Sequence, residues 1–96
     1  MQKTVIIVAG GQGMRFSQDL PKQFFYLRDR PLLIHTIDLF HHYDRGMQII
    51  VGLQEEFQSH WENVCQQFQF DIEHSLTPGG DTRFHTVKNA LPKVSR

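Results

Sequence analysis

The sequence predicts an α/β fold in which parallel strands alternate with helices that cover the sheet. Two short apolar runs, Thr4–Val8 and Met47–Leu53, have the composition of buried strands. The stretches that follow them show helical periodicity in their apolar residues. Strands that are separated by helices require right-handed parallel crossovers. The 96 residues make at most one domain, and we treat residues 1–96 as part of a single one.

The first half of the chain is expected to hold a strand, a short extended piece and a helix. Thr4–Val8 is uninterrupted and β-branched, which favours a central strand covered on both faces. Phe24–Leu27 should be extended and lead into a polar turn, with its aromatic rings used for packing. Pro31 suits the first position of a helix that runs to about Tyr43. The apolar face of this helix consists of Leu33, Ile37 and Phe40.

The second half begins with the strand Met47–Leu53 and a helix from about Glu55 to Phe68. A helical stripe defines this helix, and we expect Trp61 and Cys65 on it to be buried or half-buried. The stripe consists of Phe57, Trp61, Val64 and Phe68.

A weaker third strand is predicted at Phe70–Leu76, where apolar and polar residues alternate. A last helix is expected from about Thr82 to Val94, with Asp81 or Thr82 as its N-cap. Its inner face should consist of Val87, Ala90, Leu91 and Val94.

Composition limits the possible functions and the expected location. Lys and Arg together number 10, as do Asp and Glu, so no overall basic character indicates a nucleic-acid partner. The single cysteine excludes an internal disulfide, and the amino terminus shows no secretion signal. No apolar run approaches the roughly 20 residues of a membrane span. We therefore expect a cytoplasmic protein that uses neither nucleic acid nor membrane.

The glycine-rich loop after the first strand indicates a site for phosphate. Gly10, Gly11 and Gly13 allow the backbone to approach a ligand and to point N–H groups at an anion. Arg15 and Lys22 would add full positive charge. The spacing excludes a Walker A loop, and the dinucleotide fingerprint lacks its third glycine. A plain turn with two solvated cations remains the alternative.

A second glycine pair, Gly79-Gly80, follows the third predicted strand and precedes the last helix. In parallel sheets ligands bind beyond the carboxyl ends of the strands, so both glycine pairs are expected to face one crevice. A helix N-terminus there suits a phosphate or the polar edge of a base. Asp81 and Arg83 have the simpler alternatives of capping the helix and of lying in solvent. The six histidines show no metal-binding spacing.

Four blocks together resemble the 2-C-methyl-D-erythritol 4-phosphate cytidylyltransferase family, in the right order and over nearly the whole chain. They are Val8–Arg15, Pro21–Phe24, Pro31–Thr36 and Gly79–Leu91. The resemblance implies a Rossmann-like nucleotidyltransferase sheet, incomplete in this chain. It also implies transfer of CMP from CTP to 2-C-methyl-D-erythritol 4-phosphate with release of pyrophosphate, in non-mevalonate isoprenoid biosynthesis.

Residue roles follow from the matching positions. By resemblance to the family, the loop formed by Ala9, Gly10, Gly11 and Gly13 is expected to bind the triphosphate of CTP. The family's pattern makes Arg15 and Lys22 the cations that stabilise the transition state. On the cytosine and ribose side it places Gly80, Asp81 and Thr86, supported by Arg83. Displacement at phosphorus depends on positioning and charge neutralisation, so the absence of an activated Ser or Cys is expected.

Some features depart from the family's pattern. This chain has Ala9-Gly10-Gly11 where the family often has Ala-Ala-Gly, and the Gly-Gly form also occurs in ribitol-5-phosphate cytidylyltransferases. Thr86 stands where serine is common. The sequence ends at Arg96, before the block that supplies the family's Mg²⁺-binding aspartate, the acceptor site and the dimerisation arm. We therefore expect an amino-terminal fragment that is inactive alone and belongs to a homodimer when full length. A non-catalytic nucleotide-binding module is the other alternative.

Overall fold

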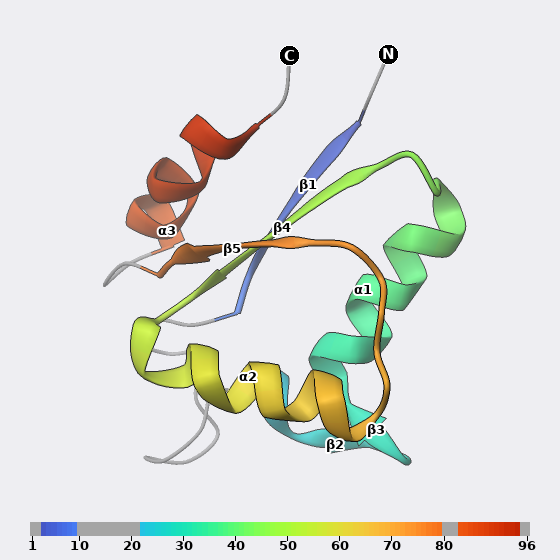
Figure 1. Cartoon of the computed structure of the whole chain (residues 1–96). Helices are drawn as coiled ribbons and strands as arrows, with labels where there is room; N and C mark the ends of the chain where they lie inside the picture. The colour runs from blue at the N-terminus through green and yellow to red at the C-terminus, as the bar shows by residue number, and fades with distance from the viewer. Residues whose placement is uncertain (1–2, 10–21, 80–82, 95–96) are drawn as a thin grey trace.

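The computed structural model describes residues 3–9, 22–79 and 83–94. Strands and helices alternate along the chain, with a small hairpin inserted before the first helix (Figure 1). The elements are β1 Thr4–Val8, the 3-10 helix η1 Lys22–Phe24, β2 Tyr26–Leu27, β3 Arg30–Pro31, α1 Leu32–Tyr43, β4 Gln48–Leu53, α2 Glu55–Gln67, β5 Ser75–Pro78, α3 Arg83–Ala90 and the 3-10 helix η2 Leu91–Lys93.

The three long strands form a parallel sheet in the order β1-β4-β5, which confirms the predicted fold class. Ile7 lies opposite Val51 in the first pair of strands, and Gly52 lies opposite Thr77 in the second. All three strands therefore end at the same edge of the sheet. Ligands of parallel sheets bind at such an edge.

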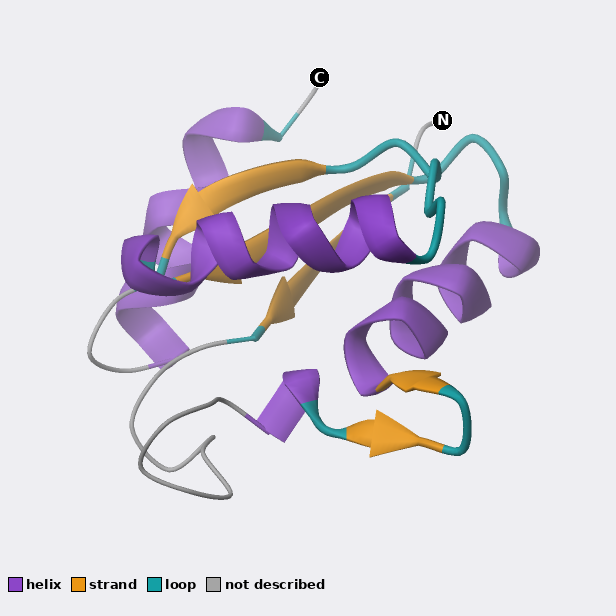
Figure 2. Ribbon diagram, turned by 60° about the horizontal axis from the view of Figure 1, so that its bottom comes forward, coloured by secondary structure: helices purple, strands orange, loops and turns teal. Residues whose placement is uncertain are grey.

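The two faces of the sheet are covered by different helices (Figure 2). On one face, Val51 and Leu53 of β4 join a single core cluster with Leu33 of α1 and Trp61 of α2. Because side chains alternate along a strand, Gly52 points to the opposite face, and α3 lies there. The helix pair α1 and α2 thus lies on one face and α3 on the other.

The two longer helices follow the predicted pattern. In α1, Leu33 and Ile37 are fully buried and Phe40 packs against the same core. In α2, Trp61 is almost fully buried, and its indole Nε1 donates to Nε2 of His74 at 3.0 Å. Cys65 is half-buried, as expected for its place on the stripe.

The third strand lies later in the chain than predicted. It covers Ser75–Pro78, whereas alternation favoured Phe70–Leu76. Phe70 and Ile72 do pack against the core, but they lie in a segment that is not yet paired with β4. A strand requires a neighbour to pair with, and pairing with β4 begins only where Ser75 meets Ile50.

Two other expectations were partly wrong. The last helix ends at Ala90 and continues as η2, because Pro92 lacks the N–H that an α-helix needs; Leu91 is consequently 57% exposed rather than on an inner face. The expected caps, Asp81 and Thr82, lie outside the described residues. In the aromatic segment Phe24 is buried, but Tyr26 is 58% exposed on the hairpin.

Among the described residues, no helix is long and apolar enough to cross a membrane.

Candidate functional site

The carboxyl edge of the sheet fixes the chain at the start of the glycine-rich loop. Ala9, the residue after β1, is fully buried, and its N–H donates to the carbonyl oxygen of Gly52 at 2.9 Å. Ala9 is therefore held by β4 one residue beyond the end of β1. Gly10, Gly11, Gly13 and Arg15 lie outside the described residues.

The short helix η1, which includes Lys22, packs against α2. Phe24 is 4% exposed, and its ring lies 4.8 Å from that of His60 and 6.3 Å from that of Trp61, measured between centroids. These contacts anchor η1 to α2. The backbone of Lys22 belongs to this short helix, but its side chain lies outside what the structure describes.

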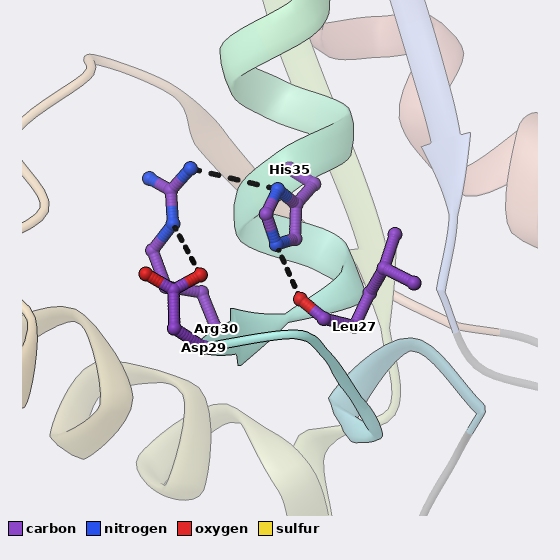
Figure 3. A network of polar contacts seen from close by, with 4 residues as sticks. All are labelled: Leu27, Asp29, Arg30 and His35. Carbon is purple, nitrogen blue, oxygen red and sulfur yellow. Dashed lines mark hydrogen bonds and ion pairs between the residues drawn. The ribbon is translucent and has the colours of Figure 1, made fainter.

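A hairpin network continues this anchoring toward α1 (Figure 3). His35 Nε2 lies 2.8 Å from the carbonyl oxygen of Leu27, and Arg30 Nη2 lies 3.5 Å from His35 Nδ1. Since a guanidinium can only donate, Nδ1 is the acceptor and Nε2 carries the proton that bonds to Leu27. The His35 side chain thus stabilises the hairpin by hydrogen bonds. Asp29 adds a 3.9 Å ion pair to Arg30.

The loops after β4 and β5 approach each other closely. A Cβ on Gly79 would lie 3.1 Å from the backbone nitrogen of Gln54, tighter than ordinary carbon contacts. A side chain at this position would require the loop at Gln54 to shift by a few tenths of an ångström. Gly80 and Asp81, which come next in the predicted nucleotide site, lie outside the described residues.

Two side chains attach the last turn of α3 to β5. The hydroxyl of Thr77 donates to the carbonyl oxygen of Asn89 at 3.0 Å, and Nδ2 of Asn89 donates to the carbonyl oxygen of Pro78 at the same distance. The helix itself starts at Arg83, after the carboxyl end of β5. Its N-terminal N–H groups and dipole favour an anion there. The Arg83 side chain lies outside the described residues.

Besides Ala9, Thr86 is the predicted ligand whose side chain environment is described. It is fully buried, and its Cγ2 methyl occupies the space where a Cβ on Gly52 would lie. The glycine in β4 thus lets α3 approach the sheet at this point. An isolated glycine inside a strand pattern is a signal of close approach, which sequence reasoning missed. The roles of Thr77 and Asn89 were also missed, although Asn89 stands inside a matched block.

Metal ligands do not gather in the described part of the chain. No group of three or more His, Cys, Asp or Glu side chains there is arranged to hold a metal ion. The adjacent pair His41 and His42 has ring centroids 6.1 Å apart, and His42 bonds to Asp38 of its own helix.

The single cysteine is not poised as a nucleophile. Burial, and secondarily the negative charge of Glu62, raise the pKa of Cys65 to about 11. The side chain is therefore a neutral thiol at pH 7.

A cavity of about 320 Å³ lies at the amino ends of β4 and β5, lined in part by Arg45, Gln48 and Ser75. The strands run from this cavity toward Ala9 and Gly79. It is therefore at the opposite end of the sheet from the candidate site.

Comparison with known proteins points to one family. The model of the family described as 2-C-methyl-D-erythritol 4-phosphate cytidylyltransferase matches residues 3–96. A protein of that name from Bacteroides thetaiotaomicron is 48% identical over 94 residues, and one from Bacteroides fragilis is 46% identical over 95 residues. These alignments cover 98% and 99% of this chain but 43% of each relative. A Porphyromonas gingivalis protein of the same name is 37% identical over 94 residues, covering 97% of this chain and 41% of the relative.

Proposed function

This chain belongs to the 2-C-methyl-D-erythritol 4-phosphate cytidylyltransferase family, and from that membership we propose that it is the CTP-binding part of such an enzyme. In the proposed reaction a phosphate oxygen of 2-C-methyl-D-erythritol 4-phosphate attacks the α-phosphorus of CTP. A new P–O bond forms, the bond from the α-phosphorus to the bridging oxygen breaks, and pyrophosphate leaves with the electron pair. The acceptor and the pathway, non-mevalonate isoprenoid biosynthesis, come from the family.

The convergence of three features at one edge of the sheet carries this proposal. Ala9 follows β1, Gly79 follows β5, and α3 begins at Arg83. Parallel strands place all three at the same edge, where backbone N–H groups attract phosphate. A site that displaces pyrophosphate needs this positioning and charge neutralisation more than it needs a nucleophile.

The residue assignments are part of the proposal. We assign the triphosphate to Ala9, Gly10, Gly11 and Gly13. Arg15 and Lys22 neutralise the charge that develops on the phosphate oxygens. On the nucleoside side we assign Gly80, Asp81, Arg83 and Thr86. Because Thr86 is fully buried against Gly52, we infer that it acts mainly by setting the position of α3.

Magnesium is proposed as the cofactor of the complete enzyme, with its protein ligand outside this chain. Among the described residues, no three His, Cys, Asp or Glu side chains are arranged to hold a metal ion. We therefore assign no step on this chain to the metal.

The chain spans 43% of the length of its Bacteroides relatives, so catalysis is proposed for a longer protein. We propose that the 96 residues alone are inactive, that the full-length enzyme is a cytoplasmic homodimer, and that neither nucleic acid nor membrane is a partner. A ribitol-5-phosphate acceptor is the second candidate, because the Gly10-Gly11 pair also occurs in that family. Turnover of the full-length protein with each of the two acceptors decides between them.

Calorimetry of this chain with CTP and Mg²⁺ tests nucleotide binding. Arg15→Ala should weaken binding at least about tenfold, since one charge-assisted phosphate contact contributes about 1.5–3 kcal/mol. Arg45→Ala is the matched control, because Arg45 is an exposed cation at the other end of the sheet. Equal binding by the two variants would refute the assignment of Arg15.

In the full-length enzyme, Arg15→Ala and Lys22→Ala should each lower turnover by orders of magnitude while the fold remains intact. Near-normal turnover of either variant contradicts its catalytic role. Pyrophosphate release by the 96-residue chain alone contradicts its proposed inactivity.

A further inference from the structure

The carboxyl end of β5 and the last turn of α3 exchange two hydrogen bonds. The hydroxyl of Thr77 donates to the carbonyl oxygen of Asn89, and the amide of Asn89 donates to the carbonyl oxygen of Pro78, each at 3.0 Å. Both acceptors are backbone carbonyls, which only accept, so the direction of each bond is fixed. We call this pair of bonds the Thr77–Asn89 clamp.

The half of the clamp that Thr77 supplies acts on the end of the helix. Thr77 is 1% exposed, so its hydroxyl needs a partner within the protein. The last four carbonyls of an α-helix have no partner inside the helix, and α3 ends at Ala90, one residue after Asn89. The bond gives the hydroxyl an acceptor and this carbonyl a donor. Thr77 thus holds the last turn of α3 from the sheet.

The half that Asn89 supplies acts on the peptide group that follows β5. Pro78 is the last residue of β5, and its carbonyl belongs to the same planar peptide group as the N–H of Gly79. A hydrogen bond to this carbonyl therefore restrains the orientation of the whole group. Gly79 also approaches the loop after β4, since a Cβ on it would lie 3.1 Å from the backbone nitrogen of Gln54. Contacts with two different elements thus hold the Pro78–Gly79 peptide.

A separate contact holds α3 on the sheet. Thr86 is fully buried, and its Cγ2 occupies the space where a Cβ on Gly52 of β4 would lie. Residues three apart in a helix are neighbours on its surface, so the face that packs Thr86 on β4 also presents Asn89 to β5. In Figure 1 this helix lies beside the end of β5. Loss of the Asn89 amide alone should therefore release the peptide and leave α3 in place.

The restrained peptide directly precedes two residues that we assign to the nucleoside. Residues 79–82 join β5 to α3, and Gly80 and Asp81 are among them. Because the chain is continuous, the orientation of the Pro78–Gly79 peptide sets the direction in which it enters Gly80. A backbone that is oriented before the ligand arrives binds more tightly, since less conformational freedom is lost on binding. The chemistry proposed above gives Asn89 no role.

We propose that Asn89 is a positioning residue for the nucleoside half of the CTP site, acting through the Pro78–Gly79 peptide, and that Thr77 supports it. The inference rests on the proposed function and extends it to a residue that need not touch the nucleotide. The triphosphate is assigned to the loop after β1, which the clamp does not contact. Asn89 therefore affects the affinity for the nucleoside and leaves the affinity for the triphosphate unchanged.

Steady-state kinetics of the full-length enzyme test this role. Asn89→Ala should raise KM for CTP about 3–10-fold and change kcat by less than about twofold, because the lost hydrogen bond supports the ground state and the transition state equally. The inhibition constant of tripolyphosphate against CTP should not change. Lys88→Ala is the matched control, because Lys88 is the exposed neighbour of Asn89 on the same helix. A lowered melting temperature with an unchanged KM overturns the proposal, and so does equal weakening of CTP and tripolyphosphate.

Two variants of Thr77 separate positioning from stability. Thr77→Ser keeps the hydroxyl and loses a buried methyl group, whereas Thr77→Val keeps the shape of the side chain and loses the donor. Both should lower the melting temperature, the first through a small cavity and the second through the unpaired carbonyl of Asn89. Only Thr77→Val should raise KM for CTP. Equal KM values in the two variants contradict the supporting role of Thr77.

A measurement without CTP distinguishes failure of this inference from failure of the proposed function. In nuclear magnetic resonance spectra the amide signal of Gly79 should shift in Asn89→Ala and stay in place in Lys88→Ala, because the N–H of Gly79 and the carbonyl of Pro78 share one peptide group. An unmoved Gly79 signal in an enzyme that turns over CTP overturns the inference alone. Absence of CTP turnover by the parent enzyme overturns the proposed function, and this inference with it.

Discussion

Replacement of Gly52 by alanine tests how α3 is positioned over the sheet. An added Cβ would overlap Cγ2 of Thr86 and lie 3.6 Å from Cβ of Thr86 and 3.7 Å from the carbonyl oxygen of Ile7. Only the contact with Cγ2 is too close, so the whole conflict lies with one methyl group. Thr86 is β-branched, helical and fully buried, so it cannot easily rotate away.

The expected cost follows from this overlap. Overpacking a buried contact destabilises a protein by about 1–3 kcal/mol. For a domain of this size each kcal/mol lowers the melting temperature by about 4–8 °C. Gly52→Ala should therefore lower the melting temperature of the chain by about 5–20 °C. Gly46→Ala is the matched control, since its Cβ would meet only Asp44 Oδ1 at 3.5 Å and should change stability by less than about 1 kcal/mol.

A double-mutant cycle isolates the contact. Thr86→Ser removes the methyl and keeps the hydroxyl, so Gly52→Ala in the Thr86→Ser background should cost less than about 0.5 kcal/mol. The coupling free energy from urea denaturation should be about 1–2 kcal/mol, well above the 0.3–0.5 kcal/mol error of additivity. Additive effects of the two substitutions would refute the reasoning.

Two further predictions concern α2, on the opposite face of the sheet from α3. His74→Ala leaves the buried Trp61 N–H without its acceptor and should lower the free energy of unfolding by about 1–3 kcal/mol, measured by the fluorescence of this single tryptophan. His74→Gln retains an acceptor and should lose less stability. Equal losses in the two variants contradict the role of the hydrogen bond. Cys65 should react with iodoacetamide at pH 8 about 100-fold more slowly than a thiol of pKa 9.0, because its pKa is about 11. Glu62→Gln should speed the reaction by removing the charge that helps raise this pKa, and an unchanged rate in that variant contradicts the electrostatic contribution.

Local patterns were sufficient for most of the elements. β1 and α2 were predicted to within a residue because an uninterrupted β-branched run and a helical stripe are properties of neighbouring residues. The third strand was misplaced because its start depends on where the chain meets β4. Leu91 was misassigned because the periodicity was extended past the effect of Pro92.

For the candidate site, the sequence predicted the residue types and the edge of the sheet, and the structure describes only part of it. Ala9 and Thr86 are placed, whereas the roles of Gly10, Gly11, Gly13, Gly80, Arg15 and Asp81 stay predictions. The buried packing of Thr86 on Gly52 was not predicted, because 34 positions separate the two residues.

By itself, the sequence determined the family, the alternation of strands and helices, and the glycine-rich loop after the first strand, all of which are encoded in contiguous residues. Only the tertiary structure decided which face each helix covers, which histidine pairs with Trp61, and that Gln23 Oε1 is buried. These features depend on contacts between distant segments, and such contacts exist only once the sheet has formed. Ala9, for example, is held in place because its N–H donates to the carbonyl oxygen of Gly52, a residue of another strand.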